Sequence, residues 1–194
     1  MVDVVGILRG LSWRNWVGSL SLLVIVVVLS SVVSVPQRWL DWAGDGGSWY
    51  ALDNYRYPPS ASALLMIAGR YTTSGRWIVV ADHFTFDLAL PIAYASFLAI
   101  SLSLLVKALF GSRSRALLVA VVPVVGGVFD LLENIGISVI CVGYPHDWTI
   151  PIARVTGWLT IGKFVGLLAS VLCSLCLAFI WSGRAVSRSH KAPA

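Results

Sequence analysis

Charged residues are scarce in this sequence. They make up 12% of its 194 residues, whereas hydrophobic residues make up 58% and the mean hydropathy is +0.84. Soluble domains carry about twice that share of charge, so the composition excludes an ordinary soluble enzyme and predicts an integral membrane protein. The net charge of +5 is spread in groups of at most three basic residues, which favours anchoring at a membrane surface over nucleic-acid binding.

Cysteine is also rare, and the common catalytic and metal-binding motifs are missing. The three cysteines are odd in number, which excludes a framework of paired disulfides. Cys173 and Cys176 form a C-x-x-C without a second pair of ligands, so we expect both to act as small packing residues. The sequence contains no phosphate-binding loop, zinc motif or serine triad. We therefore expect neither a cofactor nor a metal.

Four apolar runs are long enough to cross a bilayer, which takes about 20 residues. They cover residues 16–35, 85–106, 116–139 and 155–181. Such continuous runs predict helices, because barrel strands alternate apolar and polar positions. The sequence therefore predicts an all-α fold in which residues 1–194 form one membrane domain, a four-helix bundle. A cleaved signal peptide is the alternative for the first run, which is longer than the usual apolar region of about 7–15 residues.

Residues 36–83 form one long connection that is rich in tryptophan and tyrosine. Within it we expect a short interfacial helix over residues 62–68, with Ser60 or Ser62 as its N-cap. Two interpretations of the aromatic side chains stay open. They could form a belt on the lipid headgroups, or a lid over a ligand site.

The basic residues orient the predicted bundle. They gather before the first run, after the second and after the fourth, whereas those of the long loop are dispersed and offset by acids. The positive-inside rule then places both termini in the cytoplasm and the aromatic loop outside the cell, in a multi-pass protein of the plasma (inner) membrane.

Three polar residues interrupt the third apolar run. Asp130, Glu133 and Asn134 follow the spacing i, i+3, i+4, so a helix presents all three on one face. A charge inside a bilayer costs roughly 2.5–3.5 kcal/mol on insertion scales, and it is retained where it faces the bundle interior and acts there. The sequence therefore places a polar site on the third span.

Other polar residues fall at the same level of the predicted bundle. Asp87 lies near the start of the second span, and Lys163 lies about 30 Å from Arg184 along the fourth. Both are expected near the outer ends of their helices, beside Asp130 and Glu133. We assign the catalytic candidates as Asp130, Glu133 and Asp87, and the ligand-binding candidates as Asn134, Lys163, Tyr94, Thr160, His83 and Trp77.

Small residues accompany the polar ones. The pattern Gly162-x-x-x-Gly166 on the fourth span, together with Gly126 on the third, predicts close approach of the two helix backbones.

The chemistry of the predicted cluster stays open. Lys163 could simply pair with Glu133 or Asp130 and fix the register of the helices. However, three carboxylates exceed one ammonium, and two close carboxylates in an apolar medium do not both stay ionised. One of them would then hold a proton, which prepares either a proton donor or a cation site.

Two family resemblances bear on these motifs. The pattern Phe86-Asp87, Pro91, Tyr94, then Asp130-x-x-Glu133-Asn134, Tyr144-Pro145 and Thr160-x-x-Lys163 resembles a family of uncharacterised bacterial four-helix membrane proteins. More loosely, the architecture resembles the emopamil-binding (EXPERA) group of sterol isomerases and sigma-2-receptor-like proteins. That resemblance implies intramembrane acids around a lipid-like ligand, with Asp87, Asp130 and Glu133 in those positions.

Three functions are compatible with the sequence. The first is binding of a small isoprenoid or sterol-like ligand at the carboxylates, with acid-catalysed isomerisation or cyclisation as its chemistry. The second is a proton- or cation-coupled carrier, which at this size would work as a homo-oligomer. The third is an accessory subunit whose polar residues only assemble helices. The expected partner in the first case is a membrane lipid or another hydrophobic small molecule.

Overall fold

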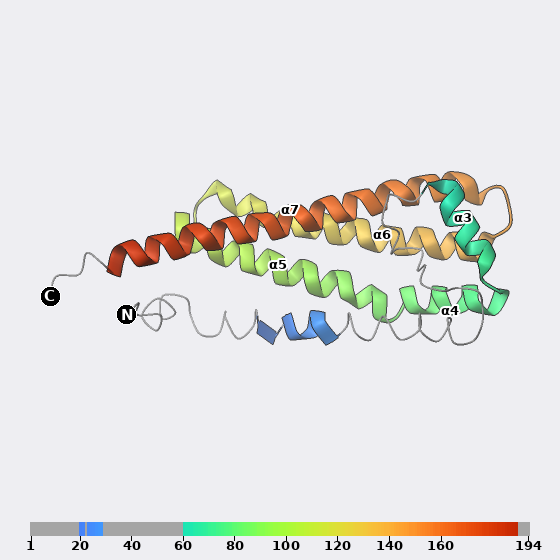
Figure 1. Cartoon of the computed structure of the whole chain (residues 1–194), viewed down its shortest axis with the longest axis horizontal. Coiled ribbons are helices and arrows are strands. Elements are labelled where there is room, and N and C mark those ends of the chain that lie inside the picture. Colours follow the sequence, from blue (N-terminus) through green and yellow to red (C-terminus); the bar gives the residue numbers. More distant parts are fainter. Residues whose placement is uncertain (1–19, 22, 29–59, 190–194) are drawn as a thin grey trace.

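The computed structural model describes residues 20–21, 23–28 and 60–189, and within these ranges it contains helices and no strand (Figure 1). The helices are α3 (Ala61–Arg70), α4 (Thr73–His83), α5 (Phe86–Phe110), the 3-10 helix η1 (Arg115–Ala120), α6 (Val121–Gly143) and α7 (Thr149–Ser189). The all-α prediction is confirmed. Of the predicted first span, only residues 20–21 and 23–28 are described, and residues 36–59 of the loop lie outside the described ranges.

Three helical segments are long and apolar enough to cross a membrane. They cover Thr73–Phe110, Arg115–Gly143 and Thr149–Arg184, and they overlap the predicted second, third and fourth spans. α6 and α7 run side by side, and α5 packs against both of them (Figure 1). α7 has 41 residues and is therefore about 60 Å long. This length exceeds the roughly 30 Å of a bilayer core.

The polarity of α6 is inverted relative to a helix of a soluble protein. Its exposed face carries large apolar residues, and its buried face carries glycines and the polar residues of the motif. The exposed set is Val121, Val124, Val125, Val128, Leu132, Ile135 and Val142, and the buried set includes Gly126, Gly127, Asp130, Glu133, Asn134 and Ser138. An apolar exterior around a polar interior suits lipid better than water as the surrounding medium.

Residues 60–83 form two helices where the sequence suggested mostly loop. Ser60 caps α3, because its hydroxyl accepts a hydrogen bond from the backbone N–H of Ala63 at 3.2 Å. Thr72 caps α4 in the same way through Gly75 N–H at 3.1 Å. The predicted short helix is thus present and extends to Arg70. α4 was not predicted, since its polar residues interrupt the apolar period that indicates a helix.

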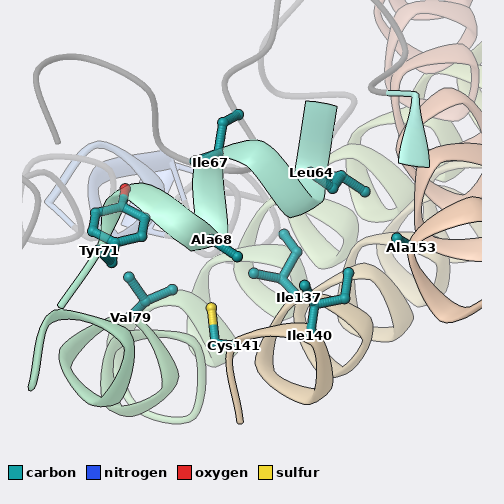
Figure 2. Packing of buried hydrophobic residues seen from close by; sticks show 9 residues of the cluster. All are labelled: Leu64, Ile67, Ala68, Tyr71, Val79, Ile137, Ile140, Cys141 and Ala153. Carbon is teal, nitrogen blue, oxygen red and sulfur yellow. The ribbon is translucent and has the colours of Figure 1, made fainter. Parts of the chain in front are cut away.

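α3 covers the end of the bundle where α6 turns into α7 (Figure 1). Its buried residues pack over α6 and α7, and Val79 of α4 completes the same apolar cluster (Figure 2). The cluster comprises Leu64, Ile67, Ala68, Tyr71, Val79, Ile137, Ile140, Cys141 and Ala153. This packing of α3 and α4 forms a cap, hereafter the α3–α4 cap.

α6 and α7 approach each other closely at glycine. A Cβ atom on Gly166 would lie 2.8 Å from the Cα atom of Gly126, and a Cβ atom on Gly162 would lie 2.8 Å from the ring of Phe129. Both distances are too short for a real Cβ contact. The close approach predicted from Gly126, Gly162 and Gly166 is therefore present, and it brings the polar faces of the two helices together.

Candidate functional site

Two carboxylates of α6 share one ammonium group of α7. Lys163 Nζ lies 2.9 Å from Asp130 Oδ1 and 2.8 Å from Glu133 Oε2. Asp130 is 4% exposed and Glu133 is fully buried. The ammonium thus lies within ion-pair distance of both carboxylates. We call Asp130, Glu133 and Lys163 the charge triad.

The remaining carboxylate oxygens of the charge triad also accept hydrogen bonds. The hydroxyl of Tyr94 on α5 donates to Asp130 Oδ2 at 2.7 Å, and the hydroxyl of Thr160 on α7 donates to Glu133 Oε1. All four oxygens of the two acids thus have a donor. Such a network ties α5, α6 and α7 together.

Removing the hydroxyl of Tyr94 leaves Asp130 Oδ2 without that donor. We expect Tyr94→Phe to lower the free energy of unfolding by about 1–3 kcal/mol, because a buried charged acceptor loses its partner. Chemical unfolding in mild detergent measures the change. A Tyr94→Phe variant as stable as wild type would contradict the assignment.

A second polar group lies beside the charge triad, at the junction of α4 and α5. His83 Nε2 is 3.8 Å from Asp87 Oδ2, and Asn134 Nδ2 donates to the backbone oxygen of Asp87 at 3.4 Å. All three residues are buried. Asn134 directly follows Glu133 on α6, so the two groups occupy neighbouring positions. His83 Nε2 and Asn134 Oδ1 have no hydrogen-bond partner among the described residues.

Helix lengths place both groups at one level of the bundle. Arg184 of α7 donates to the backbone oxygen of Leu109 at 2.9 Å, so these residues mark one end of the apolar bundle. Lys163 precedes Arg184 by 21 residues, and Asp87 precedes Lys107 by 20 residues. Each interval is about 30 Å of helix, which is the thickness of a bilayer core. The polar groups therefore lie about 30 Å from that end of the bundle, toward the α3–α4 cap.

Trp77 does not join the polar groups. It lines a separate cavity of about 160 Å³ between α4 and α6, and its side chain is 58% exposed. The cavity is lined by Thr73, Arg76, Trp77, Val80, Cys141, Val142 and Tyr144. We call it the α4–α6 cavity. Cys141 follows Asn134 by seven residues on α6, so the cavity lies about 10 Å beyond the polar groups.

Arg76 supplies the positive charge of the α4–α6 cavity. Its guanidinium donates to the backbone oxygen of Tyr71 at 2.9 Å and lies 5.4 Å from the centre of the Tyr144 ring. Neither Arg76 nor Tyr144 was predicted as a site residue, because spacing along one helix gives no signal for a contact between α4 and the end of α6.

Two further results bear on the interpretation of the site. The described residues contain no group of three or more histidine, cysteine, aspartate or glutamate side chains arranged to hold a metal ion. Comparison of the chain with family models, with curated proteins and with solved structures gives no match. The two family resemblances therefore stay predictions, as do the catalytic and ligand-binding roles of the candidate residues.

Proposed function

We propose that the chain is an integral membrane protein that binds a lipid-like molecule in the α4–α6 cavity, at the outer boundary of the bilayer. The proposal rests first on the long apolar helices and on the inverted polarity of α6. The predicted first span would complete a four-helix bundle, with both termini in the cytoplasm. In this orientation the α3–α4 cap faces outward.

The α4–α6 cavity is the observation that carries the proposal. Its wall combines apolar and aromatic side chains with one guanidinium, Arg76. Trp, Tyr and Arg side chains favour the boundary between lipid tails and headgroups, where an amphipathic ligand presents both of its ends. A cavity of about 150 Å³ admits a benzene-sized group, so this one suits a ring or one isoprenoid unit. The rest of the molecule would lie along Trp77 and Val142, which are exposed.

The geometry supports binding better than acid catalysis. The acids proposed as proton donors, Asp130 and Glu133, have a donor at every oxygen and lie in the charge triad rather than in the cavity wall. Under this proposal the charge triad fixes the helices that carry the cavity. Isomerisation or cyclisation of the ligand would need a rearrangement that frees one of these carboxyl groups.

Native mass spectrometry with lipid extraction tests the proposal. Trp77→Ala removes a wall of the cavity, and Trp158→Ala removes an equally large side chain from an exposed position on α7. We expect a specific isoprenoid or sterol-like molecule to be retained by wild type and by Trp158→Ala, and to fall at least tenfold in Trp77→Ala. Equal retention of bulk phospholipid by all three proteins would overturn the proposal.

A proton- or cation-coupled carrier is the second candidate, and the charge of the polar groups favours it. The charge triad joins two carboxylates to one ammonium, and the neighbouring Asp87 adds a further buried carboxyl group. Buried negative charge in a membrane protein attracts protons or cations. Currents on a solid-supported membrane, recorded for panels of amines, amino acids, sugars and organic acids, test this function. A current that collapses with the proton gradient supports it, and silence across the panel contradicts it.

A further inference from the structure

The imidazole of His83 is held in one tautomer. Its Nδ1 lies 2.7 Å from the backbone oxygen of Val79, one turn earlier on α4. A carbonyl oxygen only accepts hydrogen bonds, so Nδ1 must carry the ring proton. In the neutral ring, Nε2 is then the nitrogen with a lone pair. His83 is 6% exposed, and Nε2 has no hydrogen-bond partner within the described part of the chain.

Asp87 faces this unpartnered nitrogen. Its Oδ2 lies 3.8 Å from Nε2, across the junction at which α4 ends and α5 begins. Two acceptors that face each other in a buried place repel each other. One proton on Nε2 removes the conflict, because the nitrogen becomes a donor and the ring becomes a cation beside the carboxylate.

Other ionisable groups lie on α4 and on the helices packed against it. α4 itself contributes the buried carboxylate of Asp82. Two helices pack against α4 and carry further buried acids. α5 contributes Asp87, and α6 contributes Asp130 and Glu133. α6 also carries the thiol of Cys141. The two cations are Lys163, whose ammonium belongs to the charge triad, and Arg76, which lies two turns before His83 on α4 and donates to the backbone oxygen of Tyr71.

We propose that the His83–Asp87 pair is a proton-binding site. The proton adds to the lone pair of His83 Nε2, its new N–H bond points at Asp87, and release is the reverse step, so no other reactant takes part. The exposed residues Phe84 and Thr85 lie directly beside the pair at the helix junction, where a proton can enter. Asn134 holds the backbone of Asp87 and thereby fixes the first turn of α5 against α6. This site does not depend on a ligand in the α4–α6 cavity.

Nitrogen-15 NMR of histidine-labelled full-length protein in nanodiscs tests the proposal. The sequence has three histidines, so a background of His146→Gln and His190→Gln leaves His83 alone. We expect Nδ1 to be protonated throughout the pH range in which the protein stays folded, and Nε2 to gain a proton as the pH falls. At a fixed pH, Asp87→Asn should lower the ratio of charged to neutral His83 at least tenfold, whereas Asp147→Asn, at an exposed turn, should leave it unchanged.

Three results would overturn the proposal. The first is a neutral ring whose proton sits on Nε2, which would contradict the tautomer. The second is a ring that stays neutral over the whole range. The third is a ratio of charged to neutral His83 that is the same in the Asp87→Asn and Asp147→Asn variants. The first two measurements need no substitution at Asp87, so they decide the question even if Asp87→Asn fails to fold.

Discussion

Replacing Lys163 by Met should lower the free energy of unfolding by about 3–5 kcal/mol. The substitution keeps a long apolar stem but removes the ammonium that lies 2.9 Å from Asp130 Oδ1 and 2.8 Å from Glu133 Oε2. Two neighbouring carboxylates then remain buried without their shared cation. An uncompensated buried charge costs far more than an intact ion pair contributes, so this loss should be among the largest for any single side chain in the described region. Unfolding in mild detergent measures it.

Neutralising the whole charge triad separates this effect from lost packing. We expect the triple variant Asp130→Asn, Glu133→Gln, Lys163→Met to recover most of the stability, because amides keep acceptors for Tyr94 and Thr160 and leave no charge unpaired. Lys107→Met, at an exposed position, should change stability by less than about 0.5 kcal/mol. Equal stability of the Lys163 and Lys107 variants would contradict the ion-pair geometry.

Gly166→Ala should destabilise the protein by about 1–3 kcal/mol. The added Cβ atom would lie 2.8 Å from the Cα atom of Gly126 and 3.2 Å from its backbone nitrogen. Backbone atoms cannot rotate away, so α6 and α7 must separate. Lys163 lies less than one turn from Gly166, and this separation would also lengthen the contacts of the charge triad.

Gly183→Ala is the matched control on the same helix. A Cβ atom at Gly183 meets nothing within 4 Å. Alanine favours a helix over glycine by roughly 0.5–1 kcal/mol, so this variant should be neutral or more stable. Thermal unfolding of both variants tests the pair, and a shift of the same sign and size would contradict the close crossing at Gly126.

The proximity of Asp130, Glu133 and Lys163 could be predicted because it depends on two simple quantities. These are the helical period of α6 and the distance along α7 from Arg184 to Lys163. The i, i+3 spacing of Asp130 and Glu133 placed both acids on one face of α6, and counting residues back from Arg184 placed Lys163 at the same depth. Tyr94 and Thr160 were named as ligand-binding candidates, and their hydrogen bonds to the two acids were not predicted. Periodicity does not give the rotation of one helix against another, which is why the separation of Asp87 and His83 from the charge triad was not foreseen.

The α3–α4 cap illustrates what the sequence conceals. α4 contains Arg76, Asp82 and His83, so its apolar period is broken and it resembled a loop. Trp77 was grouped with the polar cluster because its aromatic neighbours suggested a lid. Its real place depends on a contact between α4 and the end of α6, two segments more than sixty residues apart in the chain. Such a contact leaves no local signal in a single sequence.

Photolabelling is the most direct test of the lipid-binding site. A diazirine-bearing isoprenoid analogue, incorporated into nanodiscs with the wild-type chain, would be activated and the labelled peptides mapped. We predict that label concentrates on residues 73–80 and 141–144, the two segments that contain the residues lining the α4–α6 cavity, and that unlabelled isoprenoid competes it away. Label spread evenly over the exposed apolar face of α7, from Phe164 to Phe179, and insensitive to competitor would contradict a specific site.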